Sequence, residues 1–105
     1  MAHLKVYENA NAATRDLYPY LVDVQSNLLD DLRTTVVIPL SSMLRVGGAT
    51  IARLCPIVKV GGERYVLLTQ QLAGIDRKVL GREVDDLSGY RPDIIAALDF
   101  MVSGI

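Results

Sequence analysis

Short alternating runs of apolar and β-branched residues predict β-strands along most of the chain. In Tyr18–Gln25, for example, Tyr20, Val22 and Val24 fall on one face of an extended chain, as in a half-buried strand. The strands predicted in this way are His3–Tyr7, Tyr18–Gln25, Thr34–Leu40, Cys55–Val60 and Glu63–Thr69, with Arg77–Leu80 as a weaker candidate. The chain is therefore expected to be mainly β.

Glycine, proline and small polar residues mark the places where these strands turn. Gly61-Gly62 separates two β-rich runs and predicts a two-residue hairpin, because both positions can adopt a positive φ. Pro39 cannot donate a hydrogen bond to a neighbouring strand, which predicts a sheet edge or a bulge at that point. Turn-forming residues in Ser26–Arg33 and Asp85–Gly89 predict two further turns.

The last segment has a helical pattern. Pro92 suits the first turn of a helix, and Asp93 beside it favours the N-terminus electrostatically. Gly104 is placed for a C-cap, so Ile94–Val102 is predicted to be helical. Asp99 is the one polar side chain in that range, whereas a helix on a single core needs an apolar stripe little wider than about 100°. The excess predicts contact with a partner subunit, with burial deep in the chain's own core as the alternative.

The composition is that of one ordinary globular domain, expected to span residues 1–105. Of the 105 residues 50 % are hydrophobic, and 11 basic against 12 acidic side chains give a formal net charge of −1. The chain is too apolar for disorder and lacks the clustered positive charge of a nucleic-acid-binding protein. Strands followed by one helix favour a small barrel-like or sandwich β domain with a terminal helix.

The cysteine count and the hydropathy set expectations for the compartment. The single Cys55 cannot form an internal disulfide, and one Cys with one His cannot make a usual zinc site, so we expect no metal or cofactor. The longest charge-free runs, Thr34–Leu44 and Tyr65–Ile75, have 11 residues each, whereas a membrane span needs about 20. The first residues show no signal-peptide pattern, and we expect a cytoplasmic protein.

Candidate catalytic groups are few, and each has a structural alternative. Cys55 and His3 could pair as nucleophile and base, but a cysteine before a proline at a strand start predicts a buried, inert thiol. The adjacent carboxylates Asp30-Asp31 and Asp85-Asp86 point to opposite faces of an extended chain, so we interpret them as turn residues. Asp23 lies in an apolar strand, where a hydrogen-bonded structural role is favoured over a catalytic one.

One apolar pair stands out among the turn residues. Leu28-Leu29 is flanked by polar side chains and is either an exposed contact patch or a pair that folds back onto the core. Taken without any relative, these patterns favour a small, dimeric β domain that acts through contacts rather than through chemistry.

Several segments, in order and at the right spacing, resemble the CcdB family of toxins. They are Leu4–Tyr7, Leu21–Ser26 with Leu28–Asp30, Val37–Leu40, Cys55–Gly61, Glu83–Ser88 and the ending Met101 to Ile105. The resemblance implies an SH3-like β barrel of short antiparallel strands with a C-terminal α-helix, assembled as a homodimer. It also implies the toxin of a type II toxin–antitoxin module, carried on a plasmid or chromosome. Such toxins are not enzymes: they bind the A subunit of DNA gyrase and trap it on cleaved DNA, and the antitoxin CcdA neutralises them.

The resemblance also implies which residues form each surface. Those implied for gyrase are Ser26, Leu28, Leu29 and Asp30 after the second strand, and Asp99, Met101, Ser103, Gly104 and Ile105 at the end of the helix. Those implied for the antitoxin are Tyr18, Tyr20, Leu44, Val46 and Thr50. Those implied for the dimer interface are Ile94, Leu98, Met101 and Val102.

The chain departs from the family at one position of the gyrase surface. The best-known members have a Trp immediately before the terminal Gly-Ile, which stacks on a gyrase arginine, whereas this chain has Ser103 and no Trp. One alternative is therefore a homologue that keeps antitoxin binding but has lost gyrase poisoning. Another is an endoribonuclease toxin of the MazF type, which shares the fold and would need a groove that stabilises a phosphorane. Scattered arginines and the net charge of −1 disfavour the ribonuclease.

Overall fold

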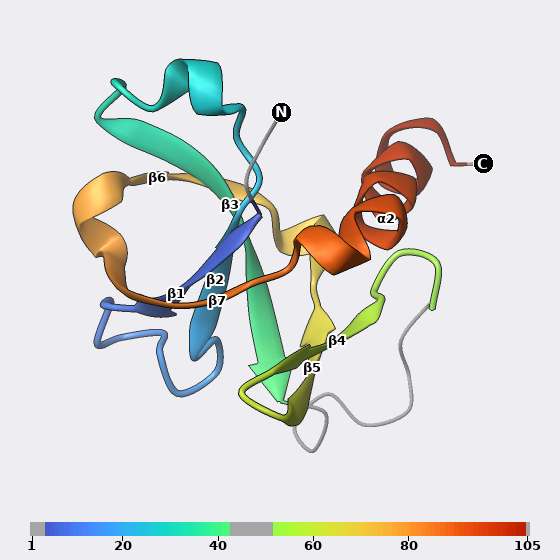
Figure 1. Cartoon of the computed structure of the whole chain (residues 1–105), viewed down its shortest axis with the longest axis horizontal. Helices are drawn as coiled ribbons and strands as arrows, with labels where there is room; N and C mark the ends of the chain where they lie inside the picture. The colour runs from blue at the N-terminus through green and yellow to red at the C-terminus, as the bar shows by residue number, and fades with distance from the viewer. Residues whose placement is uncertain (1–3, 43–51, 105) are drawn as a thin grey trace.

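The strands of the chain pair into one antiparallel sheet that curls on itself (Figure 1). The computed structural model describes residues 4–42 and 52–104. The strands are β1 (Lys5–Asn9), β2 (Tyr20–Asp23), β3 (Thr34–Ser42), β4 (Ile57–Val60), β5 (Glu63–Leu67), β6 (Ala73–Asp76) and β7 (Leu80–Asp86). Their order is β4-β5-β3-β2-β1-β7, and β6 pairs with β3 beside this path. This curled sheet with a terminal helix confirms the predicted mainly β, SH3-like architecture.

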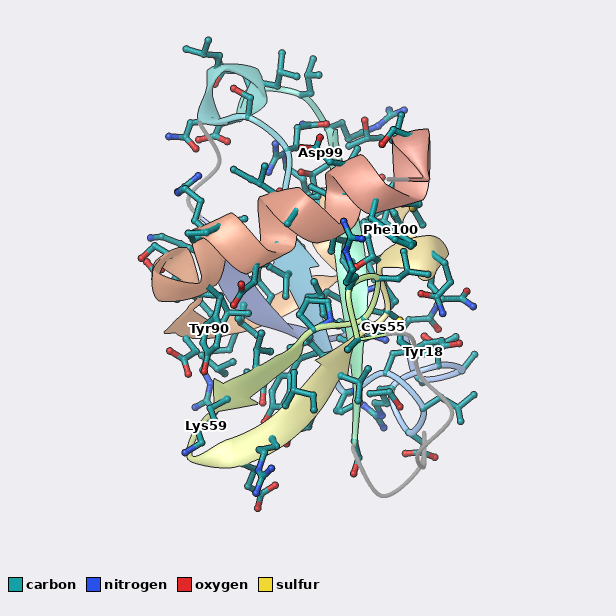
Figure 2. All side chains as sticks on the ribbon, turned by 90° about the vertical axis from the view of Figure 1, so that its right-hand side faces the viewer. Tyr18, Cys55, Lys59, Tyr90, Asp99 and Phe100 are labelled. Atoms are coloured by element: carbon teal, nitrogen blue, oxygen red, sulfur yellow. The ribbon has the colours of Figure 1, made fainter. Side chains whose placement is uncertain are left out.

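Helix α2 (Arg91–Ser103) follows the last strand and lies across the sheet (Figure 2). The predicted helix is confirmed, but it extends beyond the predicted Ile94–Val102 at both ends; Pro92 occupies the first turn and Gly104 forms the C-cap, as predicted. Gly104 has a φ of 74°, and its amide donates to the Phe100 carbonyl at 2.8 Å. Four short 3₁₀ turns complete the described elements: η1 (Asn27–Leu29), η2 (Thr69–Gln71), η3 (Arg77–Val79) and η4 (Ser88–Tyr90).

The core lies between the concave face of the sheet and α2. Val6, Val22 and Ile38 come from neighbouring strands, and each is completely buried. Helix α2 contributes Ile94 to the same cluster and packs Leu98 against it. Because Ile94 has no exposed surface, it anchors the helix to the sheet. The complete set of buried residues in this cluster is Leu4, Val6, Val22, Ile38, Leu40, Val58, Val60, Leu67, Leu87 and Ile94.

The predicted hairpin is confirmed. β4 and β5 pair from Val60↔Glu63 to Ile57↔Val66, so Gly61-Gly62 is a two-residue connection. Both glycines have a positive φ, of 59° and 85°, the conformation that this hairpin requires.

The predicted edge or bulge at Pro39 is wrong, because Pro39 lies in the middle of the central strand β3, opposite Leu21 of β2. The Val24 amide donates to the Val36 carbonyl, so alternate residues of β3 face β2, and the Pro39 nitrogen faces the other neighbour. On that side β6 pairs with Thr34–Val37 and β5 with Leu40–Ser42. Pro39 therefore occupies the point where one neighbouring strand replaces another, and no ladder bond needs its missing N–H.

Two predictions near the end of the sheet are also wrong. The Arg77–Leu80 segment was a candidate strand, but it is the 3₁₀ turn η3, and the strand begins at Leu80. Asp85 and Asp86 are strand residues of β7, not turn residues, and they pair with Val6 and Lys5 of β1. A mostly exposed strand at the margin of a sheet has no apolar alternation, which is why its sequence resembles a turn.

Side chains close the gap between the two margins of the sheet. The amides of Lys59 and Gly61, in and just after β4, donate away from β5. The Lys59 amide donates to the Tyr90 hydroxyl oxygen at 3.2 Å, and the Gly61 amide donates to Asp85 Oδ2 at 3.3 Å. The marginal strand β4 is thereby joined to β7 and η4 without a continuous ladder. We call this set of two bonds the seam; Figure 2 shows Lys59 and Tyr90 on the same side of the molecule.

The Tyr20–Tyr65 pair predicts an alkaline loss of stability. The two rings meet edge to face with centroids 5.2 Å apart. Burial, with the neighbouring Tyr20 and Glu63, raises the pKa of Tyr65 from 10.0 to about 12. The native state therefore holds this proton more tightly than the unfolded state does. The stabilisation is complete below pH 10 and is lost as the pH rises towards 12.

Tyr65→Phe removes the titrating hydroxyl, so we expect its free energy of unfolding to fall less steeply above pH 10 than that of the wild type. Urea unfolding at pH 8, 10 and 11 measures the two slopes. Parallel slopes would show that Tyr65 does not contribute to the alkaline loss. Part of the loss should remain in the variant, because burial also raises the pKa of Tyr7 and of Cys55.

Candidate functional site

The loop between β2 and β3 presents apolar side chains to solvent. Ser26 starts the turn: its Oγ accepts from the Leu28 amide at 3.3 Å, and the η1 turn follows. Leu28 is 90 % exposed and Leu29 44 % exposed, so the alternative of an exposed contact patch is the one that the structure supports. Leu32 is also exposed, and sequence reasoning did not include it. We call Ser26–Asp30 together with Leu32 the leucine loop.

Asp23 anchors the strand that leads into the leucine loop. Its Oδ1 accepts from the Thr35 hydroxyl at 2.8 Å and from the Gln25 amide at 3.0 Å. Thr35 is buried on the neighbouring β3, so these bonds fix the end of β2 against β3. The prediction of a hydrogen-bonded structural role for Asp23 is confirmed.

The C-terminal end of α2 forms a second exposed surface, the helix tip. Ser103 is exposed, and its hydroxyl donates to the Asp99 carbonyl at 2.7 Å. The Asp99 side chain faces solvent, and Met101 is half-buried. The Arg53 guanidinium lies over the Phe100 ring, 4.8 Å from its centroid, and ties the segment before β4 to the helix. Ile105 lies outside the described residues.

The leucine loop and the helix tip lie towards the same end of the molecule but are separated in a single chain. Figures 1 and 2 both show them in the upper half, with η1 and the end of α2 well apart. The helix packs against η2 and η4 rather than against η1. The residues predicted for gyrase therefore form two surfaces in one protomer, not one continuous patch.

The predicted dimer residues divide between the core and the surface. Ile94 is fully buried in the chain's own core and offers no area to a partner, whereas Val102 is 82 % exposed. Leu98 and Met101 are half-buried. Sequence reasoning missed Ile95, which is 45 % exposed and shares a helix face with Leu98 and Val102 at the spacing i, i+3, i+7. That spacing is the signal that could have found it. We call these three residues the apolar stripe.

The antitoxin residues can be placed only in part. Leu44, Val46 and Thr50 lie outside the described residues. Tyr18 is half-buried and lines a hollow of about 170 Å³, together with Leu21, Val37 and Ile75. Tyr20 points instead towards Tyr65, in the edge-to-face pair described above. The two tyrosines therefore lie in different surroundings.

The cysteine considered as a nucleophile is buried. Cys55 is 3 % exposed, and its thiol contacts Gln70 Oε1 at 3.2 Å. Burial also raises the pKa of this thiol. The predicted burial of Cys55 is confirmed. His3 lies outside the described residues. In the part of the chain that is described, no three His, Cys, Asp or Glu side chains are grouped as a metal site would need.

Several cations at the surface face carboxylates. Arg33 lies 3.9 Å from Asp76, and Arg82 lies 3.6 Å from Glu8. Lys5 is 3.4 Å from Glu83. Such pairing lowers the positive potential that a phosphate backbone needs. No helix within the described residues is both long and apolar enough to cross a membrane.

The geometry is that of a contact surface: exposed leucines on an anchored loop, an exposed helix end and a half-exposed apolar stripe. The chain matches the family model described as CcdB protein over residues 3–104, nearly its whole length. The match includes the leucine loop, the seam and the helix tip up to Gly104. CcdB proteins are toxins of toxin–antitoxin systems. This chain belongs to the CcdB family of toxins.

Proposed function

We propose that this chain binds the A subunit of DNA gyrase and traps the cleaved DNA–gyrase complex, as the resemblance of its sequence implies. The observation that carries the proposal is the exposure of the two segments that the resemblance assigns to gyrase. Leu28 is 90 % exposed on the leucine loop, and Ser103 and Gly104 are exposed at the helix tip. Large apolar side chains at an ordered surface are typical of a protein-binding site. The chain acts as a poison and not as an enzyme.

The active species is a homodimer in this proposal. Ile95 and Val102 of the apolar stripe are exposed, and Leu98 between them is half-buried where the stripe borders the core. A second copy that covers this stripe by a two-fold axis would bury it twice, once in each protomer. Met101 borders the stripe on the core side and would contribute at its margin. The dimer brings two helix tips together, so the gyrase surface combines residues of both copies.

A CcdA-like antitoxin and a cytoplasmic location complete the proposal. Tyr18 and its hollow form an apolar recess with the polar side chains of Asn11 and Thr14 beside it. An extended antitoxin segment could place one apolar side chain there while its backbone bonds to the polar groups. Figure 2 shows Tyr18 low on the molecule, away from the helix tip. Antitoxin and gyrase would then contact separate surfaces at these points.

The ribonuclease alternative has less support. It needs free cations to hold a scissile phosphate, and Arg33, Arg77 and Arg82 each face a carboxylate within 4 Å. The alternative of a homologue that has lost gyrase poisoning is based on Ser103, which stands in place of the family's Trp. Both alternatives are outcomes of the experiment below.

A gyrase cleavage assay tests the proposal. Supercoiled plasmid, ATP, purified gyrase and the toxin are incubated and then quenched with detergent and protease. We expect linear DNA that depends on the toxin. No linear DNA with gyrases from several bacteria, together with retained antitoxin binding, would establish the homologue that has lost poisoning. Cleaved RNA in a parallel incubation would establish the ribonuclease.

The leucine loop is tested by Leu28→Asp in the same assay. A charge at the centre of the contact should raise the toxin concentration needed for half-maximal linear DNA at least about tenfold. Leu17→Asp is the matched control, because Leu17 is an exposed leucine in the loop before β2, at the other end of the molecule (Figure 1). Equal potency of the two variants would remove the leucine loop from the gyrase surface.

A further inference from the structure

Arg77 joins the leucine loop to a distant part of the chain. It starts η3, yet its Nε donates to the Leu32 carbonyl at 2.6 Å and its Nη2 donates to the Leu29 carbonyl at 3.1 Å. Its backbone amide also donates to the Arg33 carbonyl at 2.9 Å. One residue therefore holds two carbonyls of the leucine loop from outside, and also the carbonyl of Arg33 directly after it.

The same guanidinium is held in place by two carboxylates. Nη1 lies 3.7 Å from Asp23 Oδ2, and Nη2 lies 3.9 Å from Asp30 Oδ1. The Arg77 side chain is 27 % exposed, and that of Asp23 16 % exposed, so water screens this pair less than it screens an open surface pair. Asp23 in turn is fixed by the buried Thr35. The two carboxylates thus fix the orientation in which the planar guanidinium donates to the loop carbonyls.

The loop has turn bonds of its own, and Arg77 adds bonds from outside. The amides of Leu29, Asp30 and Leu32 donate to the carbonyls of Ser26, Asn27 and Leu29 at 3.0, 3.1 and 3.1 Å. Ser26 Oγ accepts from Leu28 at 3.3 Å, and Gln25 Nε2 lies 3.5 Å from the Leu29 carbonyl. A single 3₁₀ turn such as η1 has poor hydrogen-bond geometry and does not persist without outside contacts. No η1 residue is buried. Arg77 therefore supplies, in addition to the loop's own turn, the bonds that tie the loop to a distant part of the chain.

We propose that Arg77 is a positioning residue for the leucine loop. Through the Leu29 and Leu32 carbonyls it fixes the backbone so that the Leu28 and Leu29 side chains face outward before gyrase arrives. A loop that is already ordered loses less conformational entropy on binding, which raises affinity without any contact between Arg77 and the target. The inference rests on the proposed function, in which this loop contacts gyrase.

Arg77→Lys is the first test, because lysine keeps the positive charge near Asp23 but lacks the planar fork that reaches two carbonyls. We expect about tenfold weaker binding to the purified gyrase A subunit, measured by surface plasmon resonance. Arg77→Gln, which lacks the charge as well, should weaken binding at least as much. Arg82→Gln is the matched control, because Arg82 is an exposed arginine of β7 whose partner is Glu8.

Hydrogen exchange separates positioning from a general loss of structure. In Arg77→Lys the amides of Leu29 and Leu32 should exchange about tenfold faster, while core amides such as that of Ile38 should keep their wild-type protection. Faster exchange throughout the sheet, or unchanged exchange in the loop, would overturn the positioning role. This readout needs no gyrase, so it remains decisive if the proposed function fails.

A double-mutant cycle identifies which of the two proposals is at fault. If Arg77 acts through Leu28, the losses of gyrase affinity in Arg77→Lys and Leu28→Ala will be less than additive in the double variant. Additive losses would show that Arg77 acts elsewhere. Normal affinity of Leu28→Asp would instead show that the loop does not contact gyrase. In that case the proposed function fails at this loop, and the exchange experiment alone judges the positioning role.

Discussion

Removing Gly104 and Ile105 should abolish gyrase poisoning and leave the fold intact. The helix tip is exposed, and the resemblance places both residues in the contact with gyrase. Helix α2 is anchored well before the cut, by Ile94 and Ala97, which are completely buried. The truncation removes one capping bond, from the Gly104 amide to Phe100, which is worth about 1 kcal/mol at most. We expect the toxin concentration for half-maximal linear DNA to rise about a hundredfold or more.

The cleavage assay measures this loss, and thermal unfolding checks that the truncated chain is folded. Retained binding to a CcdA-like antitoxin would show that only the gyrase surface has been removed. Ser103→Trp, which restores the family's residue next to the same ending, is the opposite variant and should increase potency. Undiminished linear DNA from the truncated toxin would exclude the helix tip from the gyrase site.

Ile94→Ala and Ile95→Ala should have different consequences although the residues are adjacent and chemically identical. Ile94 is 0 % exposed and joins α2 to the sheet, so its truncation leaves a cavity and should lower the free energy of unfolding by about 2–5 kcal/mol. Ile95 is 45 % exposed on the apolar stripe, and its truncation should change the stability of the isolated protomer by less than about 1 kcal/mol. Ile95→Ala should instead weaken the dimer and raise its dissociation constant about tenfold.

Urea unfolding at low protein concentration measures the first effect, and analytical ultracentrifugation across a concentration series measures the second. The low concentration matters because dimerisation adds to apparent stability by mass action. Equal losses of protomer stability in the two variants would contradict the placement of α2. An unchanged dissociation constant in Ile95→Ala would remove the apolar stripe from the dimer interface.

The predictable parts of the fold are those with a local physical cause. Gly61-Gly62 predicts a hairpin because few other sequences allow two successive positive φ values. Pro92 and Gly104 marked the ends of α2 because each suits one end of a helix and not the other. These signals need no knowledge of the rest of the chain.

The parts that sequence reasoning missed depend on neighbours distant in sequence. β7 is a strand because β1 provides a ladder for it, not because its own residues alternate. Pro39 is tolerated in a central strand because two different strands meet beside it. In the candidate site, the flanking turn residues pointed to Leu28 and Leu29. Arg77 could not be found in that way, since it reaches the loop from 45 residues or more along the chain.

The seam restricts how an extended ligand can bind. The outward amides of a marginal strand are normally unpaired. A peptide or a second sheet can hydrogen-bond to them and extend the ladder. In β4 the outward amide of Lys59 already donates to Tyr90, and that of Gly61, just after the strand, donates to Asp85. A partner would have to displace both acceptors before it could add a strand there. The margin at β4 is therefore protected against templated self-association.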